Sequence, residues 1–198
     1  MRTVLFLPGT GASPDFWKPV GSRLPSGWTK HYFGWPGLGN QPFDPAINSY
    51  DDLVRLVETK LDAPVDLVAQ SMGGMIAAQV ALAHPALVRR LVLTATSGGI
   101  DMTAFATADW RSNYRKLHPD AAPWITEPRA AANLPVERIA CPTLLIWGDA
   151  DPISPLAVGR HLKARLPDAR LHVVASSDHH FATTQPDEIA PLIADHLA

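Results

Sequence analysis

The sequence predicts an α/β fold, in which a parallel sheet is covered by helices on both faces. Short apolar runs recur along the 198 residues, and most are continuously apolar, as expected of parallel strands buried on both faces. Helical patterns lie between these runs, and strand–helix alternation of this kind produces a parallel sheet with right-handed crossovers. A chain of this length is predicted to form one domain, residues 1–198.

Six apolar runs are predicted to be strands. The first follows Arg2 and runs directly into Pro8-Gly9 with no cleavage-site pattern, so we expect a buried strand there and no signal peptide. The six predicted strands are Thr3–Leu7, Lys30–Phe33, Val65–Ala69, Leu91–Thr96, Thr143–Trp147 and Leu171–Ala175.

Four helices are predicted between and after these strands. Ser49-Tyr-Asp-Asp52 is typical of a capping box, and apolar residues recur at helical spacing after it, from Leu53 to Leu61. A second helix ends at His84-Pro85, because the residue before a proline disfavours helical geometry. The other three predicted helices are Met75–Ala83, Pro155–Leu166 and a last one from about Asp187.

One segment, from about Gly98 to Ala140, shows no strand pattern. A connection this long inside a compact domain is usually functional, so we expect a cap or lid over about residues 98–140. The alternative is a surface loop, which its four aromatic residues disfavour. These are Phe105, Trp110, Tyr114 and Trp124.

The composition excludes several classes of protein. Hydrophobic residues make up 46% of the chain and charged residues 18%, which argues against disorder. The formal charge of −2 and the lack of a basic cluster leave nothing to attract nucleic acid, and no apolar run is long enough to span a membrane. Cys141 is the only cysteine, so no intrachain disulfide can form and a cytoplasmic location is expected.

The most informative stretch surrounds Ser71. An apolar run stops at this serine and a helical pattern begins at once, with Ala69 and Gly73 two positions to either side. This is an A-x-S-x-G version of the G-x-S-x-G nucleophile elbow. A sharp strand-to-helix turn tends to strain the serine backbone, and larger side chains two residues away would collide with neighbouring elements. The same turn places the N–H of Met72 at a helix N-terminus, where it could bind an oxyanion.

Further motifs follow in a fixed order, and together they resemble the α/β-hydrolase superfamily over nearly the whole chain. A D-x-P-G-x-G-like loop and an H-x-x-x-x-x-x-P ending, from His179 to Pro186, belong to the same resemblance. The segments that carry it are Leu7–Gly11, Phe33–Gly39, Ala69–Gly73, Trp147–Pro155 and Ser177–His180.

The resemblance implies a Ser-acid-His triad in that chain order, with Ser71 as nucleophile. The pattern G-x-x-D-x-x-x-P fits Gly148, Asp151 and Pro155, so Asp151 is the expected acid. Asp149 is the second candidate for the acid, although a role in ordering the turn fits it better. Asp101 is the third and weakest candidate.

Two adjacent histidines could supply the base. Counting back from Pro186, the family spacing selects His179, with Asp178 in place of the usual glycine. A slip of one residue would select His180, which is otherwise expected to line the pocket. No ligand spacing supports a metal site, and we expect neither a metal nor another cofactor.

The resemblance also implies the oxyanion hole and the sheet. Its backbone donors are expected at Thr10 and Met72, and the substrate pocket is expected to include Trp35, Trp110, Trp124 and His180. The sheet should have six parallel strands in the order 2-1-3-4-5-6, without the family's usual N-terminal β-hairpin. The cap is short, which favours modest and accessible substrates.

The expected activity is that of a serine hydrolase without cofactor, most readily a carboxylesterase for small or medium acyl esters. The same triad would also serve a thioesterase, a lactonase or a carbon–carbon bond hydrolase, because this fold hosts many reactions. A binding protein that keeps the triad as a ligand receptor is a further alternative. The expected partner is a small-molecule ester, without nucleic acid or membrane, and the chain is expected to be a monomer or a homodimer.

Overall fold

The computed structural model describes residues 2–127 and 133–198 of the chain. Their six strands form one parallel sheet in the order β2-β1-β3-β4-β5-β6, which confirms the predicted topology. The strands are β1 (Thr3–Leu7), β2 (Thr29–Tyr32), β3 (Val65–Gln70), β4 (Val88–Thr94), β5 (Thr143–Gly148) and β6 (Ala169–Val174).

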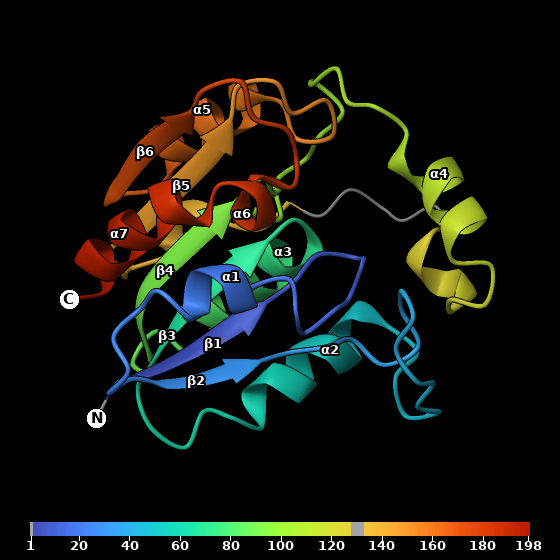
Figure 1. Cartoon of the computed structure of the whole chain (residues 1–198), viewed down its shortest axis with the longest axis horizontal. Helices are drawn as coiled ribbons and strands as arrows, with labels where there is room; N and C mark the ends of the chain where they lie inside the picture. Colours follow the sequence, from blue (N-terminus) through green and yellow to red (C-terminus); the bar gives the residue numbers. More distant parts are fainter. Residues whose placement is uncertain (1, 128–132) are drawn as a thin grey trace.

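Helices cover both faces of the sheet, as Figure 1 shows. Helices α2, α3 and α5 pack on one face, and α1, α6 and α7 pack on the other. Their bounds are α1 (Lys18–Gly21), α2 (Tyr50–Glu58), α3 (Met72–Ala83), α5 (Leu156–Arg165), α6 (Phe181–Thr184) and α7 (Pro186–Leu197).

The core consists of two apolar layers, one on each side of the sheet. Alternate residues of β1 separate between them, so that Leu5 and Leu7 face α3 while Val4 and Phe6 face α1 and α7. The inner strands β3 and β5 are buried along their whole length, which explains their mostly apolar sequences. Among the described residues, no helix is both long and apolar enough to cross a membrane.

The boundaries of β4 and of the helix at Ser49 have local causes. β4 runs over Val88–Thr94 instead of the predicted Leu91–Thr96, because Ala95 has a φ of 46° and ends the strand. Val88 pairs with Val65, so the strand also begins earlier than predicted. At the start of α2 the Ser49 hydroxyl accepts the Asp52 N–H at 3.2 Å, as the capping-box pattern predicts.

The segment expected to form a cap is more regular than predicted. It contains helix α4 (Trp110–Leu117) and two 3-10 turns, η1 (Pro123–Ile125) and η2 (Val136–Arg138). α4 lies apart from the helices that cover the sheet (Figure 1). Its first turn is capped by the Asp109 carboxylate, which accepts the Arg111 N–H at 3.0 Å. Residues 128–132 of the expected cap lie outside the described residues.

The start of α3 approaches the end of β1 without any side chain between them. A Cβ on Gly73 would lie 2.5 Å from the carbonyl oxygens of both Leu7 and Pro8, closer than real Cβ atoms approach backbone. Glycine at this position therefore allows α3 to begin directly above β1, as the elbow motif predicts.

Replacing Gly73 by alanine should destabilise the protein by about 1–3 kcal/mol, the usual cost of forcing extra atoms into a packed site. The added methyl group must push α3 away from β1. The free energy of unfolding in urea would measure the effect, with Gly27→Ala as control, because nothing lies within 4 Å of a Cβ at Gly27. Equal stability of the two variants would contradict this account of the glycine.

Candidate active site

Ser71 occupies the sharp turn between β3 and α3. Its φ of 53° and ψ of −121° lie in a region that non-glycine residues rarely adopt, at a cost of about 1–3 kcal/mol. Backbone hydrogen bonds on both sides hold this conformation. The Ser71 N–H donates to the Thr94 carbonyl at 3.0 Å, and the Ser71 carbonyl accepts the Gly74 N–H at 3.0 Å. The turn leaves the serine at the wall of a cavity.

The structure brings Asp151 and His179 together. Asp151 follows β5 and His179 follows β6, and Asp151 Oδ2 lies 2.7 Å from His179 Nδ1. The other carboxylate oxygen accepts the N–H groups of Ile153 at 2.8 Å and Ser154 at 3.0 Å. Both side chains of the pair are almost fully buried. A carboxylate held by such donors is a fixed acceptor, so we assign the proton of the neutral imidazole to Nδ1.

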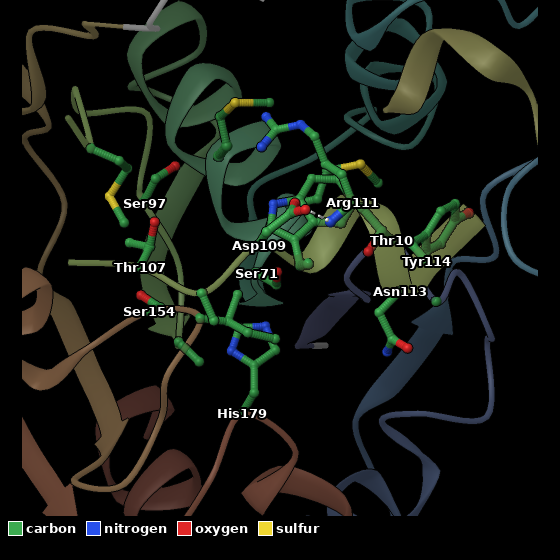
Figure 2. Close-up of a pocket in the computed structure, with 18 of the residues that line it drawn as sticks. Thr10, Ser71, Ser97, Thr107, Asp109, Arg111, Asn113, Tyr114, Ser154 and His179 are labelled. Atoms are coloured by element: carbon green, nitrogen blue, oxygen red, sulfur yellow. Dashed lines mark hydrogen bonds between the residues drawn. The ribbon is translucent and has the colours of Figure 1, made fainter. Parts of the chain in front are cut away.

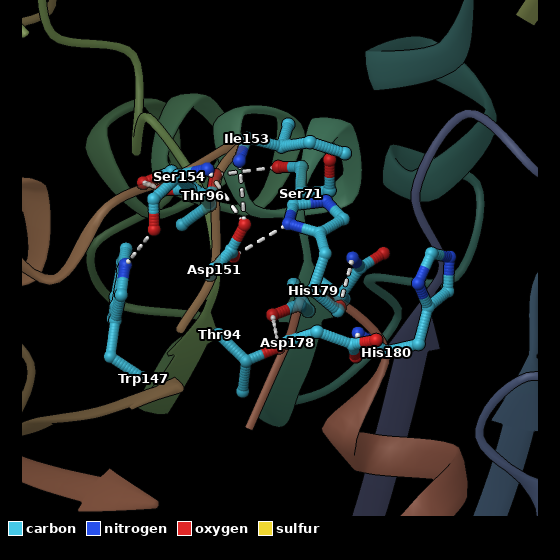
Figure 3. Close-up of polar contacts among 12 residues, drawn as sticks. Ser71, Thr94, Thr96, Trp147, Asp151, Ile153, Ser154, Asp178, His179 and His180 are labelled. Atoms are coloured by element: carbon cyan, nitrogen blue, oxygen red, sulfur yellow. Dashed lines mark hydrogen bonds and ion pairs between the residues drawn. The ribbon is translucent and has the colours of Figure 1, made fainter. Parts of the chain in front are cut away.

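This assignment leaves Nε2 of His179 as an acceptor. Figure 3 shows the imidazole between the Asp151 carboxylate and Ser71, and both Ser71 and His179 line the same cavity. The loop that carries His179 is also tied to β3, because the buried Gln70 amide donates to the His179 carbonyl at 3.3 Å. The structure thus brings the three expected site residues to one place, with the His179 imidazole next to both Asp151 and Ser71.

The alternative acids and base take other positions. Asp149 links two loops, because its carboxylate accepts the N–H of Ser177, in the loop after β6, at 3.4 Å. Asp101 is exposed and accepts the Thr103 N–H at 2.9 Å. His180 is also exposed and lies edge-on to His179, with ring centres 5.7 Å apart. Among the described residues, only Asp151 has a carboxylate within hydrogen-bond distance of the His179 ring.

The two residues expected to supply oxyanion donors, Thr10 and Met72, flank the serine at the cavity wall. Met72 begins α3, where the first N–H groups of a helix have no intrahelical acceptor. The loop that carries Thr10 comes very near Ser71. A Cβ on the preceding residue, Gly9, would lie 3.0 Å from Ser71 Cβ and 2.4 Å from Gln70 Oε1.

The cavity has a volume of about 680 Å³ and a mixed lining, part of which Figure 2 shows. Apolar side chains on its wall are Met72, Met75, Ile100, Met102 and Ile153. Polar and charged side chains come mainly from the segment around α4, and these are Asp101, Thr103, Thr107, Asp109, Arg111, Asn113, Tyr114, His118 and Glu127.

Two of the four expected pocket residues line this cavity, namely Trp110 and His180. The expectation for Trp35 is corrected, because its side chain is fully buried in the core. Its indole N–H donates to the Pro8 carbonyl at 2.8 Å, so it supports the loop of Thr10 from inside the protein. Trp124 also lies off the cavity wall, half-buried and edge-on to Tyr50.

Sequence reasoning missed the polar wall formed by α4. Tyr114 is buried there, and its hydroxyl accepts the Gly39 N–H at 2.7 Å. Burial raises the pKa of this tyrosine. A sequence pattern could have predicted the helix that forms this wall. Asp109 is a typical N-cap residue, and aromatic rings follow it at a spacing of four residues, at Trp110, Tyr114 and His118. In the described part of the chain, no group of three acidic, histidine or cysteine residues could hold a metal ion.

Comparison with known proteins supports the resemblance to the α/β-hydrolase superfamily. A family model described as the alpha/beta hydrolase fold matches residues 2–134, and a second, described as TAP-like protein, matches residues 112–198. The pimeloyl-[acyl-carrier protein] methyl ester esterase of Neisseria meningitidis serogroup B is 27% identical, with 100% of this chain and 93% of the relative covered. The enzyme of that name from Chromobacterium violaceum is 26% identical, with 98% and 93% covered.

Solved structures agree in fold. A meta-cleavage product hydrolase from Pseudomonas fluorescens superposes with a TM-score of 0.80 at 19% identity, covering 99% of this chain and 90% of that one. A hydrolase from Pseudomonas aeruginosa gives a TM-score of 0.77 at 20% identity, covering 100% and 90%. The first family model spans more than half of the chain. The chain therefore belongs to the α/β-hydrolase fold family and is an esterase-like serine hydrolase of that fold.

Proposed function

We propose that this protein is a carboxylesterase that cleaves small or medium acyl esters through an acyl-enzyme intermediate, without a cofactor. The observation that carries the proposal is the buried Asp151–His179 hydrogen bond of 2.7 Å, whose imidazole lies beside Ser71 at a strained strand-to-helix turn. A serine hydroxyl becomes an effective nucleophile when a neighbouring imidazole accepts its proton.

Each residue has a defined step in this mechanism. Ser71 Oγ attacks the ester carbonyl while His179 Nε2 accepts the hydroxyl proton, and Asp151 stabilises the imidazolium that forms. The N–H groups of Thr10 and Met72 bind the oxyanion of the tetrahedral intermediate. Its collapse expels the alcohol, which takes the proton from His179. Water, deprotonated by the same imidazole, then attacks the acyl-enzyme and releases the acid and the free serine.

The cavity and the relatives suggest the class of ester. A volume of about 680 Å³ suits a small or medium acyl group, since ligand pockets commonly measure 300–1,000 Å³. The relatives named pimeloyl-[acyl-carrier protein] methyl ester esterase make methyl esters of medium-length acyl groups the first substrates to test. The single cysteine, Cys141, has no partner for an intrachain disulfide, and we propose a cytoplasmic location.

We further propose that the segment of residues 98–140 acts as a short cap over the nucleophile. Its support is that Trp110 and Tyr114 of this segment line the same cavity as Ser71. The hydrogen bond between Gly39 and the Tyr114 hydroxyl fastens α4 to the loop that follows β2.

Ser71→Ala should abolish labelling by a fluorophosphonate probe and lower ester hydrolysis by several orders of magnitude, because the variant lacks the hydroxyl that forms the acyl-enzyme in this mechanism. Mass spectrometry of the labelled protein and turnover of 4-nitrophenyl acetate measure the two effects. Circular dichroism serves as the check on folding. Labelling that persists in this variant would place the nucleophile elsewhere.

Asp151→Asn should reduce turnover by about 10⁴-fold, since an amide in place of the carboxylate favours the wrong histidine tautomer. Asp149→Asn is the matched control and should keep most of the activity, because Asp149 bonds to the Ser177 N–H and not to the His179 ring, and an asparagine oxygen can still accept that N–H. His179→Ala should be inactive and His180→Ala at least partly active. A larger loss in Asp149→Asn or His180→Ala would move the assignment to that residue.

Trp110→Ala should change the preference between short and longer acyl esters by about 1–3 kcal/mol, the usual scale of pocket discrimination. Trp110 lines the cavity, whereas Trp124 packs on Tyr50 behind the wall. Trp124→Ala is therefore the matched control, expected to lose thermal stability while keeping the chain-length profile. The ratio of kcat/KM for acetate and octanoate esters measures the preference. An unchanged ratio in both variants would argue against the cap as part of the pocket.

A further inference from the structure

A chain of hydrogen bonds connects the Ser71 backbone to Asp151 through two buried side chains, Thr96 and Ser154. Neither belongs to the proposed triad or oxyanion hole. Thr96 is 1% exposed and Ser154 is 3% exposed, and Figure 3 shows both next to Asp151 and Ser71. Polar side chains that are buried this deeply need hydrogen-bond partners. The groups to which Thr96 and Ser154 bond therefore show what these two side chains hold in place.

The Thr96 hydroxyl acts both as a donor and as an acceptor. It donates its single hydrogen to the Ser71 carbonyl at 2.5 Å and accepts the Gly98 N–H at 3.0 Å. A Cβ on Gly74 would lie 2.6–2.7 Å from the Thr96 side chain. The second glycine of the Gly73-Gly74 pair therefore gives Thr96 room to reach the Ser71 carbonyl.

Ser154 continues the connection to the acid. Its hydroxyl donates to the Thr96 carbonyl at 3.3 Å, and its backbone N–H donates to Asp151 Oδ1 at 3.0 Å. The Ser154 carbonyl in turn accepts the indole N–H of the fully buried Trp147 at 2.8 Å. The acid and the nucleophile are thus held in one set of hydrogen bonds, with Thr96 at its centre.

The Ser71 carbonyl shares a planar peptide unit with the Met72 N–H. No peptide bond among the described residues is cis, so the carbonyl and the N–H of this unit point in opposite directions. Any group that holds the Ser71 carbonyl therefore also sets the direction of the Met72 N–H. A second donor to that carbonyl, the Gly74 N–H, belongs to the helix itself, whereas Thr96 comes from the loop after β4.

We propose that Thr96 is a positioning residue for the oxyanion hole: its hydroxyl fixes the Ser71–Met72 peptide plane and thereby aims the Met72 N–H at the developing oxyanion. The inference rests on the proposed function, in which Ser71 is the nucleophile and the Met72 N–H is an oxyanion donor. Ser154 supports Thr96 and couples this peptide to the loop of the acid. The strained Ser71 conformation makes the external support necessary, because a peptide in an unfavourable region relaxes when its partners are lost.

Thr96→Val tests the proposal, since valine keeps the shape of threonine and removes only the hydroxyl. Turnover of 4-nitrophenyl acetate should fall about 10- to 100-fold with little change in KM, because a misaimed donor weakens transition-state binding alone. The affinity for a trifluoromethyl ketone, which forms an anionic tetrahedral adduct, should fall in parallel. Thr96→Ser keeps the hydroxyl and should retain turnover close to that of the unmodified protein.

The outcomes separate this inference from the function itself. A purely structural role would lower the thermal midpoint of Thr96→Val and leave kcat and inhibitor affinity of the folded protein unchanged, which would overturn the proposal. If Thr96→Val does not fold, Ser154→Ala decides: a lower kcat at constant KM supports the network, and an unchanged kcat overturns it. Failure of the unmodified protein to react with fluorophosphonate would instead contradict the proposed function.

Discussion

The strained turn at Ser71 is the constraint on which the rest of the site depends. A φ of 53° at a non-glycine residue persists only if its surroundings hold it, and here they do so from three sides. The Thr94 carbonyl binds its N–H, Thr96 binds its carbonyl, and Gly73 lets α3 begin against the end of β1. These contacts come from β4, from the loop after β4 and from α3, so the turn exists only within the assembled sheet.

The buried acid follows from the same sheet. Asp151 lies in the loop after β5, and a carboxylate in this position needs partners for both oxygens because burial removes water. Backbone N–H groups of its own loop satisfy one oxygen, and His179 from the next loop satisfies the other. Parallel strands deliver these loops to one edge, since the carboxyl ends of β3, β5 and β6 all lie there.

The cavity wall depends on a segment that the sheet does not dictate. α4 contributes Trp110, Arg111 and Tyr114, and it is fastened to the loop after β2 by the Tyr114 hydroxyl. The alignment with the Neisseria meningitidis relative extends over 243 positions, whereas this chain has 198 residues, so that relative carries additional residues within the matched span. In this chain, Ser71, Asp151 and His179 follow strands of the sheet, whereas part of the cavity wall comes from α4, as is usual where segments on a fixed scaffold form a binding site.

The sequence alone determined the strands, four of the helices and the turn at Ser71, because buried parallel strands and sharp turns leave strong local patterns. Its resemblance to the α/β-hydrolase superfamily added the sheet order and the candidate residues Asp151 and His179. It could not determine where aromatic side chains of irregular segments point. Trp35 was expected at the pocket. It lies in the core instead, where its indole N–H donates to the Pro8 carbonyl. The role of Thr96 was also invisible, because it arises from a contact between residues 25 positions apart. Local patterns reflect local geometry, whereas pocket walls and supporting hydrogen bonds form between distant segments only when the tertiary structure brings them together.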